Sequence, residues 1–421
     1  MLKFIFDRKN CSFMRLWLAQ LISQFGDRIN QMALIGLIAE RSPGSTMDLA
    51  KLLSFTIIPV FIVGPIAGVY VDRWDNRKTL FLCDIARGVL VMLIPMIFIF
   101  WESLIPIYII IFLVFCFSRF YVPAKMSILP DLVEKEHLVM ANSLITTTGM
   151  LAFVFGCAFG GFLVYWSGAR GGFVVNAVTF FVSGLLVISI PRDFRLHFDR
   201  KELIQAGQEV LALERSVIRE LKEGALYLIR NKGIRFVINL LFTLMAAAGA
   251  VYVVIIVFIQ DCFESVTRDL GILAVFLGAG LFVGALAYGR WGKKIPWHKT
   301  IFYCLFAGGV MMILFVLMVR IYPQLIVAAV LAFLLGLMLG PIFIAANTIA
   351  LLVSDENMRG KVFSSLEIII HFAFLVAMLS SSLLSEYVDH SWILVGVGGV
   401  FTLLGLLGLV KYRKGLGIAL S

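Results

Sequence analysis

The feature that most constrains the fold of this chain is a series of twelve apolar segments separated by polar connections. A membrane-spanning α-helix needs about 20 apolar residues, whereas a strand of a membrane barrel needs about half as many. Because the segments have the length of helices, we expect an all-α integral membrane protein with about twelve transmembrane helices. The expected spans are residues 13–40, 48–72, 79–101, 104–122, 138–166, 171–190, 234–260, 268–291, 299–320, 323–352, 359–388 and 391–412.

Composition agrees with a membrane protein and gives no sign of an enzyme. Hydrophobic residues make up 61% of the 421 residues and charged residues only 15%, against about one quarter charged in soluble domains. The six cysteines form no Cys-x-x-Cys pair, and no Gly-rich loop carries the Lys-Ser/Thr that binds nucleotide phosphates. We therefore expect no metal site, no cofactor and no enzymatic activity. An intramembrane enzyme and a non-transporting scaffold are the alternatives.

The distribution of basic residues predicts the orientation of the chain in the membrane. Of the 36 Lys and Arg residues, 29 fall in connections that twelve crossings place on one side, and five fall on the other side. Lys and Arg next to membrane spans stay in the cytoplasm, so both termini are expected there. The net charge of +10 is thus explained without a nucleic-acid partner. The first apolar run lacks a small-residue cleavage site, so we expect an uncleaved first span.

Six apolar segments precede a long polar stretch and six follow it. We predict a six-helix bundle over residues 1–190, a cytoplasmic linker over 191–233 and a second six-helix bundle over 234–421. Apolar residues recur in the linker every three or four positions, which predicts an amphipathic helix on the membrane surface, and its basic residues favour anionic lipid headgroups. The dipeptide Arg73-Trp74 recurs as Arg290-Trp291, which is typical of a transporter built from two pseudo-symmetric halves.

The connection between the second and third spans contains Gly68, Asp72, Arg73, Arg77 and Lys78. One interpretation is a loop that is basic only because it lies in the cytoplasm. The pattern of Gly, three residues, Asp-Arg and a basic pair closely resembles the signature loop of the major facilitator superfamily of secondary transporters. In that family the loop latches the cytoplasmic ends of two helices. The resemblance therefore implies that these residues act in gating rather than in substrate binding.

Asp84 and Arg87 follow this loop on the third span and are further gating candidates. Side chains three positions apart on a helix lie on one face, so the two can form an ion pair. Such a pair can be purely structural, or it can link to Asp72 and Arg73.

The first span carries an unusual number of polar residues for a membrane helix. Charged residues inside spans are costly and point to function, so Asp27 is the strongest candidate for binding a proton, a cation or the basic group of a substrate. A structural pairing of Asp27 and Arg28 with other helices is the alternative. The residues that share helical spacing, and are expected to face a watery interior, are Gln20, Ser23, Gln24, Asp27, Asn30 and Gln31.

Glu367 and His371 lie four positions apart on the eleventh span. Such a pair can relay protons, because histidine titrates near physiological pH and a desolvated glutamate can be raised toward it; a satisfied polar pair between helices is the alternative. Further candidates for the wall of a central cavity are Asn142, Thr146, Asn239 and Asn347.

The fifth span carries a stripe of small residues that includes Gly156 and Gly160, which favours close helix packing. The run from Gly156 to Gly161 resembles the fifth-helix motif of superfamily antiporters, except that Cys157 replaces its proline. This departure weakens the inference of export by antiport.

Several motifs together resemble one branch of the superfamily, that of macrolide efflux proteins and siderophore exporters. They are Gln24-Phe25-Gly26-Asp27, Pro123-Ala124-Lys125 and Arg359-Gly360-Lys361-Val362-Phe363. The resemblance implies a proton-coupled secondary transporter that exports an amphiphilic small molecule by alternating access, in a bacterial inner membrane and as a monomer. Lysophospholipid flippases share the Phe-Gly-Asp and Pro-Ala-Lys features and are the alternative.

Overall fold

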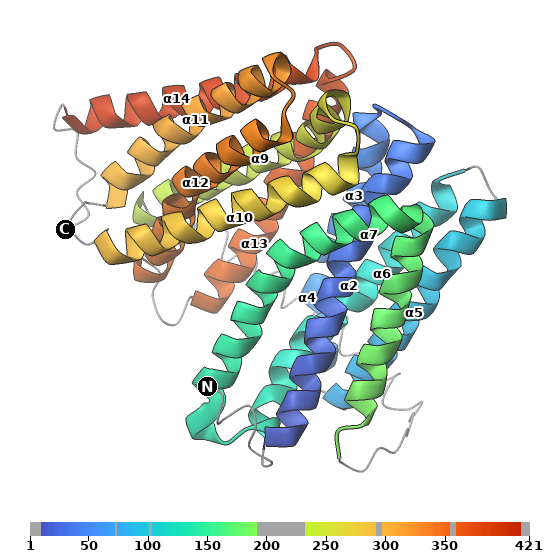
Figure 1. Ribbon diagram of the computed structural model, residues 1–421. Coiled ribbons are helices and arrows are strands. Elements are labelled where there is room, and N and C mark those ends of the chain that lie inside the picture. Colours follow the sequence, from blue (N-terminus) through green and yellow to red (C-terminus); the bar gives the residue numbers. More distant parts are fainter. Residues whose placement is uncertain are drawn as a thin grey trace. The chain divides into compact units, whose positions relative to one another are not determined.

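The computed structural model describes residues 10–71, 74–100, 103–191, 232–291, 297–353 and 359–413, and all regular structure in these residues is helical (Figure 1). The predicted all-α class is therefore confirmed. The amphipathic helix predicted in the linker lies outside the described residues, as do Asp72 and Arg73. The elements are α2 (Cys11–Arg41), α3 (Thr46–Ile62), α4 (Gly64–Val71), α5 (Asn76–Phe100), α6 (Ile105–Leu132), η2 (Lys135–His137), α7 (Leu138–Ile188), α9 (Lys232–Cys262), α10 (Val266–Trp291), α11 (Trp297–Ile321), α12 (Leu325–Val353), α13 (Arg359–Leu384) and α14 (His390–Arg413).

Nine candidate membrane spans occur among the described residues, judged by length and hydropathy. One of them, Lys135–Ile188, is 54 residues long, which at 1.5 Å per residue is far more than the ~30 Å of a hydrocarbon core. It contains two helices that meet at Gly168, where φ is 72°. Glycine occupies this left-handed conformation without the steric cost of a Cβ atom. The predicted separation of the fifth and sixth spans therefore falls at a backbone turn.

The predicted second span is interrupted in the structure. It forms α3 and α4, which are separated by a turn at Val63. Pro65 has no N–H to donate to the carbonyl four residues earlier, so the helical hydrogen-bond ladder cannot continue through this point. The sequence pattern alone predicted a continuous helix, because every residue at the break is apolar or small.

The chain divides into two compact units, unit 1 (residues 1–37 and 52–218) and unit 2 (residues 38–51 and 219–421). In unit 1, α5 packs against α6 and α7, and α4 packs against α6. The helix α2 approaches α7 so closely that a Cβ atom on Gly160 would lie 3.0 Å from the Cα atom of Ile29. The small-residue stripe of the fifth span therefore does bring two helices together, as its spacing predicted.

Unit 2 repeats the neighbour relations of unit 1. Counting passes in order, α9 to α14 correspond to α2, α3–α4, α5, α6 and the two parts of α7. The pairs α10–α12, α11–α12 and α11–α14 pack together, as α4–α6, α5–α6 and α5–α7 do in unit 1. The pair α9–α13 corresponds to the approach of α2 to α7. The prediction of two pseudo-symmetric six-helix halves is thus confirmed.

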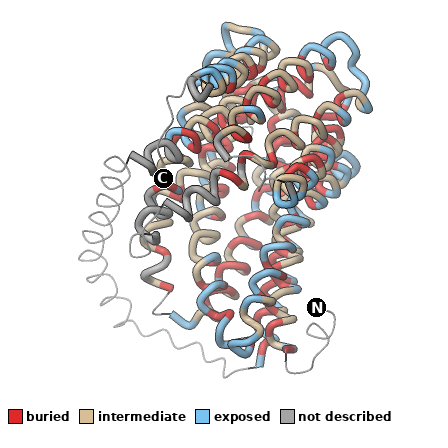
Figure 2. Tube along the Cα trace, turned by 90° about the vertical axis from the view of Figure 1, so that its left-hand side faces the viewer, coloured by how far each residue is buried: buried red, intermediate tan, exposed pale blue. Residues whose placement is uncertain are grey.

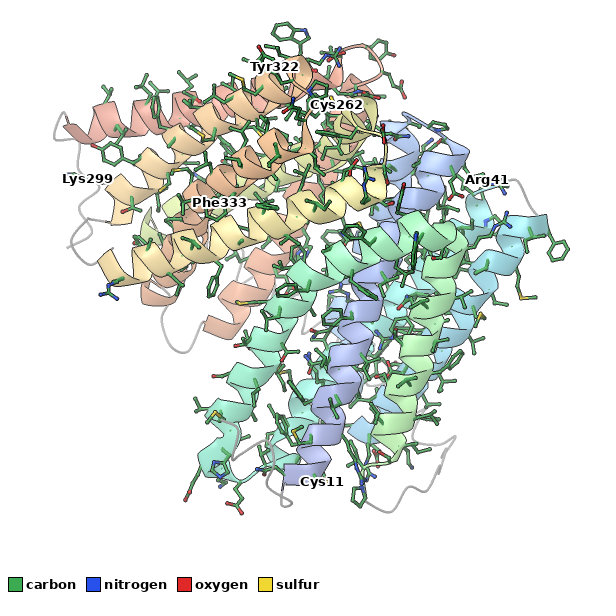
Figure 3. All side chains as sticks on the ribbon, viewed as in Figure 1. Cys11, Arg41, Cys262, Lys299, Tyr322 and Phe333 are labelled. Atoms are coloured by element: carbon green, nitrogen blue, oxygen red, sulfur yellow. The ribbon has the colours of Figure 1, made fainter. Side chains whose placement is uncertain are left out.

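Glycines allow α10 and α12 of unit 2 to pack closely. A Cβ atom on Gly280 of α10 would lie 2.0 Å from the carbonyl oxygen of Phe333 on α12, and one on Gly336 would lie 2.2 Å from the carbonyl oxygen of Leu277. Phe333 and the neighbouring helix α10 are visible in Figure 3. Buried and exposed residues alternate along the helices (Figure 2), as expected when one face packs inside a unit and another does not.

Candidate functional site

A buried ion pair on α5 is the centre of a polar cluster in unit 1, which we define as Asp27, Asp84, Arg87, Lys125 and Ser183. Asp84 is 0% exposed and Arg87 is 2% exposed. The Arg87 guanidinium donates to the Asp84 carboxylate, and the Ser183 hydroxyl on α7 donates to the other carboxylate oxygen over 2.7 Å. The ion pair that the spacing allows is therefore formed, and Ser183 joins it to a second helix.

The Arg87 guanidinium is also enclosed by two aromatic rings. Its central carbon lies 4.5 Å from the ring centroid of Tyr121 and 4.3 Å from that of Phe180. Its Nε atom donates to the carbonyl oxygen of Cys83 over 3.3 Å. A buried cation needs such compensation for lost hydration, so Arg87 is held in one place.

Asp27 projects from α2 toward this ion pair and is only half-buried. Its carboxylate interacts electrostatically with Arg87, Arg28 and Lys125, and Asp84 also acts on it. Among the described residues no direct hydrogen bond or ion pair is formed by the Asp27 carboxylate. Asp27 thus contributes a negative charge that is attracted by several cations but fixed by none of them.

Arg28 points to a different neighbour from Asp27. Its guanidinium lies 4.8 Å from the ring centroid of Phe153 on α7 and donates to Gln31 over 3.0 Å. Consecutive residues point about 100° apart around a helix. Arg28 therefore contacts Phe153 on α7, whereas Asp27 lies near the ion pair on α5.

Lys125 is a residue of the cluster that sequence reasoning misplaced. We expected the fourth span to end at residue 122 and placed Lys125 in a cytoplasmic connection, but α6 continues to Leu132 and Lys125 is only 8% exposed. Pro123 and Pro130 lie inside α6, since membrane helices tolerate proline where neighbouring groups satisfy the freed carbonyls. The sequence does contain a signal for this position. Lys125 is surrounded mostly by apolar residues, and a charged side chain in such a helix has to face the protein interior.

The amide side chains of α2 add polar atoms to the same unit. Gln20 is 2% exposed and Asn30 is 3% exposed. Within the described residues, both amide atoms of Gln20, Oε1 of Gln24 and Oδ1 of Asn30 are buried without a hydrogen-bond partner. Buried amides normally have partners, so these atoms are available to a ligand or to water. No group of three or more His, Cys, Asp or Glu side chains in the described part could hold a metal ion.

Other candidates in unit 1 lie on its exposed surface. Asn142 and Thr146 on α7 are exposed, and the Thr146 hydroxyl donates to the carbonyl oxygen of Asn142 over 2.9 Å. Among the described residues, neither side chain forms a hydrogen bond or ion pair with the polar cluster.

Those candidate side chains of unit 2 that the structure describes do not form a second charged cluster. Asn239 and Glu367 are exposed, and Nδ1 of His371 lies 2.8 Å from the backbone oxygen of Glu367. The imidazole thus interacts with the backbone of Glu367 at this position. Asn347 belongs to α12, but its side chain lies outside the described residues.

The loop candidates that the structure describes hold the start of α5. Asp75 caps this helix, because its Oδ1 atom accepts from the backbone N–H groups of Arg77 and Lys78 over 2.9 and 3.1 Å. Arg77 is 3% exposed, and its guanidinium donates to the carbonyl oxygen of Ile190 over 2.6 Å. Arg77 therefore connects the start of α5 to the residues that follow α7. Gly68 lies in α4.

A second group of charges lies where α9, α11 and α14 meet in unit 2. Nδ1 of His390 lies 3.0 Å from Asp261, and Arg320 lies 3.6 Å from Asp389. Hydrogen bonds from Ser391 lower the pKa of Asp389, which lies before α14, and the nearby Arg320 lowers it further. Cys262 and Tyr322 are at this same end of unit 2, and Lys299 is at the opposite end of α11 (Figure 3).

The family model of the Major Facilitator Superfamily matches residues 16–327. The chain belongs to this superfamily. It is a transporter with several membrane-spanning helices, and not an enzyme. Membership of the superfamily implies a small-molecule substrate for the transporter.

Relatives of this transporter include efflux proteins. The chain is 28% identical over 404 residues to the MFS-type transporter YkuC of Bacillus subtilis, covering 92% of this chain and 90% of the relative. It is 25% identical over 294 residues to macrolide efflux protein A of Streptococcus pyogenes, covering 67% of each. The crystal structure of a bacterial homologue of the iron transporter ferroportin, in an inward-facing state, has the same fold, with a TM-score of 0.71, 13% identity and coverage of 94% and 98%.

Proposed function

We propose that this transporter is a proton-coupled exporter of an amphiphilic small molecule and that Asp27 carries the coupling. The observation that supports this most directly is the position of Asp27, which several cations attract but which no described side chain binds directly. An intramembrane carboxylate of this kind is a functional-site candidate.

Asp84 is the less suitable proton carrier, although it lies in the same cluster. Its carboxylate accepts hydrogen bonds from both Arg87 and Ser183. A proton or a substrate group at Asp84 would therefore have to displace one of these two donors. Asp27 is without such direct bonds among the described residues, so a proton or the basic group of a substrate can compete for it.

Export by alternating access follows from the same proposal. The two halves, residues 1–190 and 234–421, rock about a central cavity while the loop from Gly68 to Lys78 latches and releases the cytoplasmic ends. Similarity to macrolide efflux protein A supports efflux as the direction and an amphiphilic substrate. The positive-inside charge distribution supports a bacterial inner membrane and cytoplasmic termini, with anionic lipids at the cytoplasmic face and a monomer as the working unit.

The test is pH-gradient-driven uptake into inverted vesicles. A macrolide, a catechol siderophore and a fluorescent lysophospholipid are supplied separately to vesicles that contain the wild type or Asp27→Asn. Asp131→Asn, at an exposed site near the end of α6, is the control with the same change of charge. We expect uptake of a soluble compound that collapses with the gradient and is lost in Asp27→Asn only. Movement of the lysophospholipid alone, indifferent to the gradient, would instead establish a flippase.

A further inference from the structure

The polar cluster of unit 1 contains both a positive and a negative group that are left without direct partners. Asp27 on α2 and Lys125 on α6 act on each other electrostatically. Their charged atoms form no ion pair within 4.0 Å, and the described part of the chain supplies no hydrogen bond to either group. The protein thus brings two opposite charges, one on α2 and one on α6, near one another without joining them.

The other charges of the region are already engaged. Arg87 is neutralised by its direct pair with Asp84, and Arg28 is directed to Phe153 and Gln31 on another side of α2. Among the four charged residues of the polar cluster, all of them described, Lys125 and Asp27 therefore remain as the pair that can interact with a ligand. Lys125 is only 8% exposed, and a cation in such a site gains much from an anionic partner.

A buried amide on the same face of α2 as Asp27 can complete a polar binding site. Gln20 is 2% exposed and has both amide atoms unpaired within the described residues. It lies seven positions, or about two turns, before Asp27, and so on the same face of α2. An amide can donate to an acidic group and accept from a basic one, which suits a ligand that carries both.

We propose that the substrate is zwitterionic, with a basic group that binds Asp27 and a carboxylate or phosphate that binds Lys125. This inference rests on the proposed function, which it deepens by naming the class of substrate. Binding of the basic group to Asp27 and of the acidic group to Lys125 is consistent with proton-coupled export. A substrate ammonium and a proton compete for Asp27, as proton-driven export requires, while Lys125 holds the acidic group and takes no part in the competition.

The test is a binding cycle with four forms of one fluorescent amphiphile, using the purified full-length transporter. The zwitterion is Nε-dansyl-lysine; its methyl ester is cationic, its Nα-acetyl derivative is anionic, and the doubly blocked form is neutral. We expect the wild type to bind the zwitterion about tenfold more tightly than either singly charged form, because each of those forms loses one charge-assisted contact.

Variants of the transporter test which side chain binds the carboxylate of the zwitterion and which binds its ammonium group. Lys125→Gln should bind the zwitterion and the methyl ester equally, and Asp27→Asn should bind the zwitterion and the acetyl derivative equally. Lys125→Arg should keep the wild-type preference, and Lys135→Gln, at an exposed surface position, is the control for loss of one positive charge. Binding of the neutral form by every variant shows that the site is folded.

The experiments distinguish failure of the zwitterion proposal from failure of proton-coupled export. If the wild type has no preference for the zwitterion, or if Lys125→Gln retains the preference for the carboxylate, the zwitterion proposal is overturned. If the binding cycle holds but the zwitterion is not moved by a pH gradient, proton-coupled export fails while this inference stands. Competition by lysophosphatidylethanolamine but not by free amino acids would identify a lipid headgroup as the source of the zwitterion.

Discussion

Ser183 on α7 donates a hydrogen bond to the carboxylate of Asp84 on α5, 99 positions earlier in the chain. This contact makes the Asp84–Arg87 ion pair part of the packing between two helices rather than a feature of one helix. Because the pair is almost fully buried, the loss of one partner leaves the other as an uncompensated charge.

The first prediction concerns this pair. Asp84→Asn or Arg87→Gln alone should lower the free energy of unfolding by ~3–5 kcal/mol, as is typical when one partner of a buried pair is removed. The double variant should cost less than the sum of the two, because no charge is left unpaired. Thermal unfolding of the purified protein, followed by tryptophan fluorescence, measures both. Lys51→Gln breaks the exposed pair with Asp48 and should change stability by less than ~1 kcal/mol. Costs that simply add in the double variant would contradict the prediction.

The second prediction concerns the α10–α12 contact. Gly280→Ala should destabilise unit 2 by ~1–3 kcal/mol, because the new Cβ atom would meet the backbone oxygen of Phe333 and force the helices apart. The matched control is Gly396→Ala on α14, where a Cβ atom meets nothing within 4 Å; it should be neutral or slightly stabilising, since alanine favours a helix. Equal thermal midpoints for the two variants would show that the α10–α12 contact is not as close as described.

Much of this fold could be predicted because membrane spans are a matter of length and hydropathy. A chain with long apolar segments has few other ways to satisfy its backbone hydrogen bonds in lipid. The i,i+3 pairing of Asp84 with Arg87 and the packing role of Gly160 were also predictable, because they depend on spacing along a single helix.

The parts that could not be predicted depend on contacts between helices. Nothing in the spacing indicates that Ser183 meets Asp84 or that Lys125 faces Asp27. Proline has opposite effects in two helices: α6 continues through Pro123, whereas the predicted second span breaks just before Pro65. Whether a helix survives a proline depends on neighbours that satisfy the free carbonyl, and these belong to other parts of the chain.

The third prediction is a pH dependence at Asp389. Hydrogen bonds from Ser391 and the charge of Arg320 lower its pKa in the folded state, so the ionised form stabilises the fold. This contribution is complete above the unfolded pKa of about 3.9 and is lost as the pH falls through the lower folded value. Asp389→Asn should therefore lower the thermal midpoint at pH 7, by a small amount because Asp389 is half-exposed. The two midpoints should converge below about pH 4. A difference that stays constant across this range would exclude a role for the charge.

The fourth prediction concerns the contact between Arg77 and Ile190. Arg77→Gln should cost ~1.5–3 kcal/mol, because a buried charge-assisted hydrogen bond to the Ile190 carbonyl is lost. The adjacent Lys78→Gln removes the same charge, but the Lys78 contact with Asp75 uses its backbone N–H group, so this variant should unfold at nearly the wild-type temperature. Equal losses in the two variants would mean that the positive charge of the loop, rather than the bond to Ile190, stabilises unit 1. The contact anchors the start of α5 to the residues that follow α7, so any movement of Arg77 has to displace or carry these residues with it.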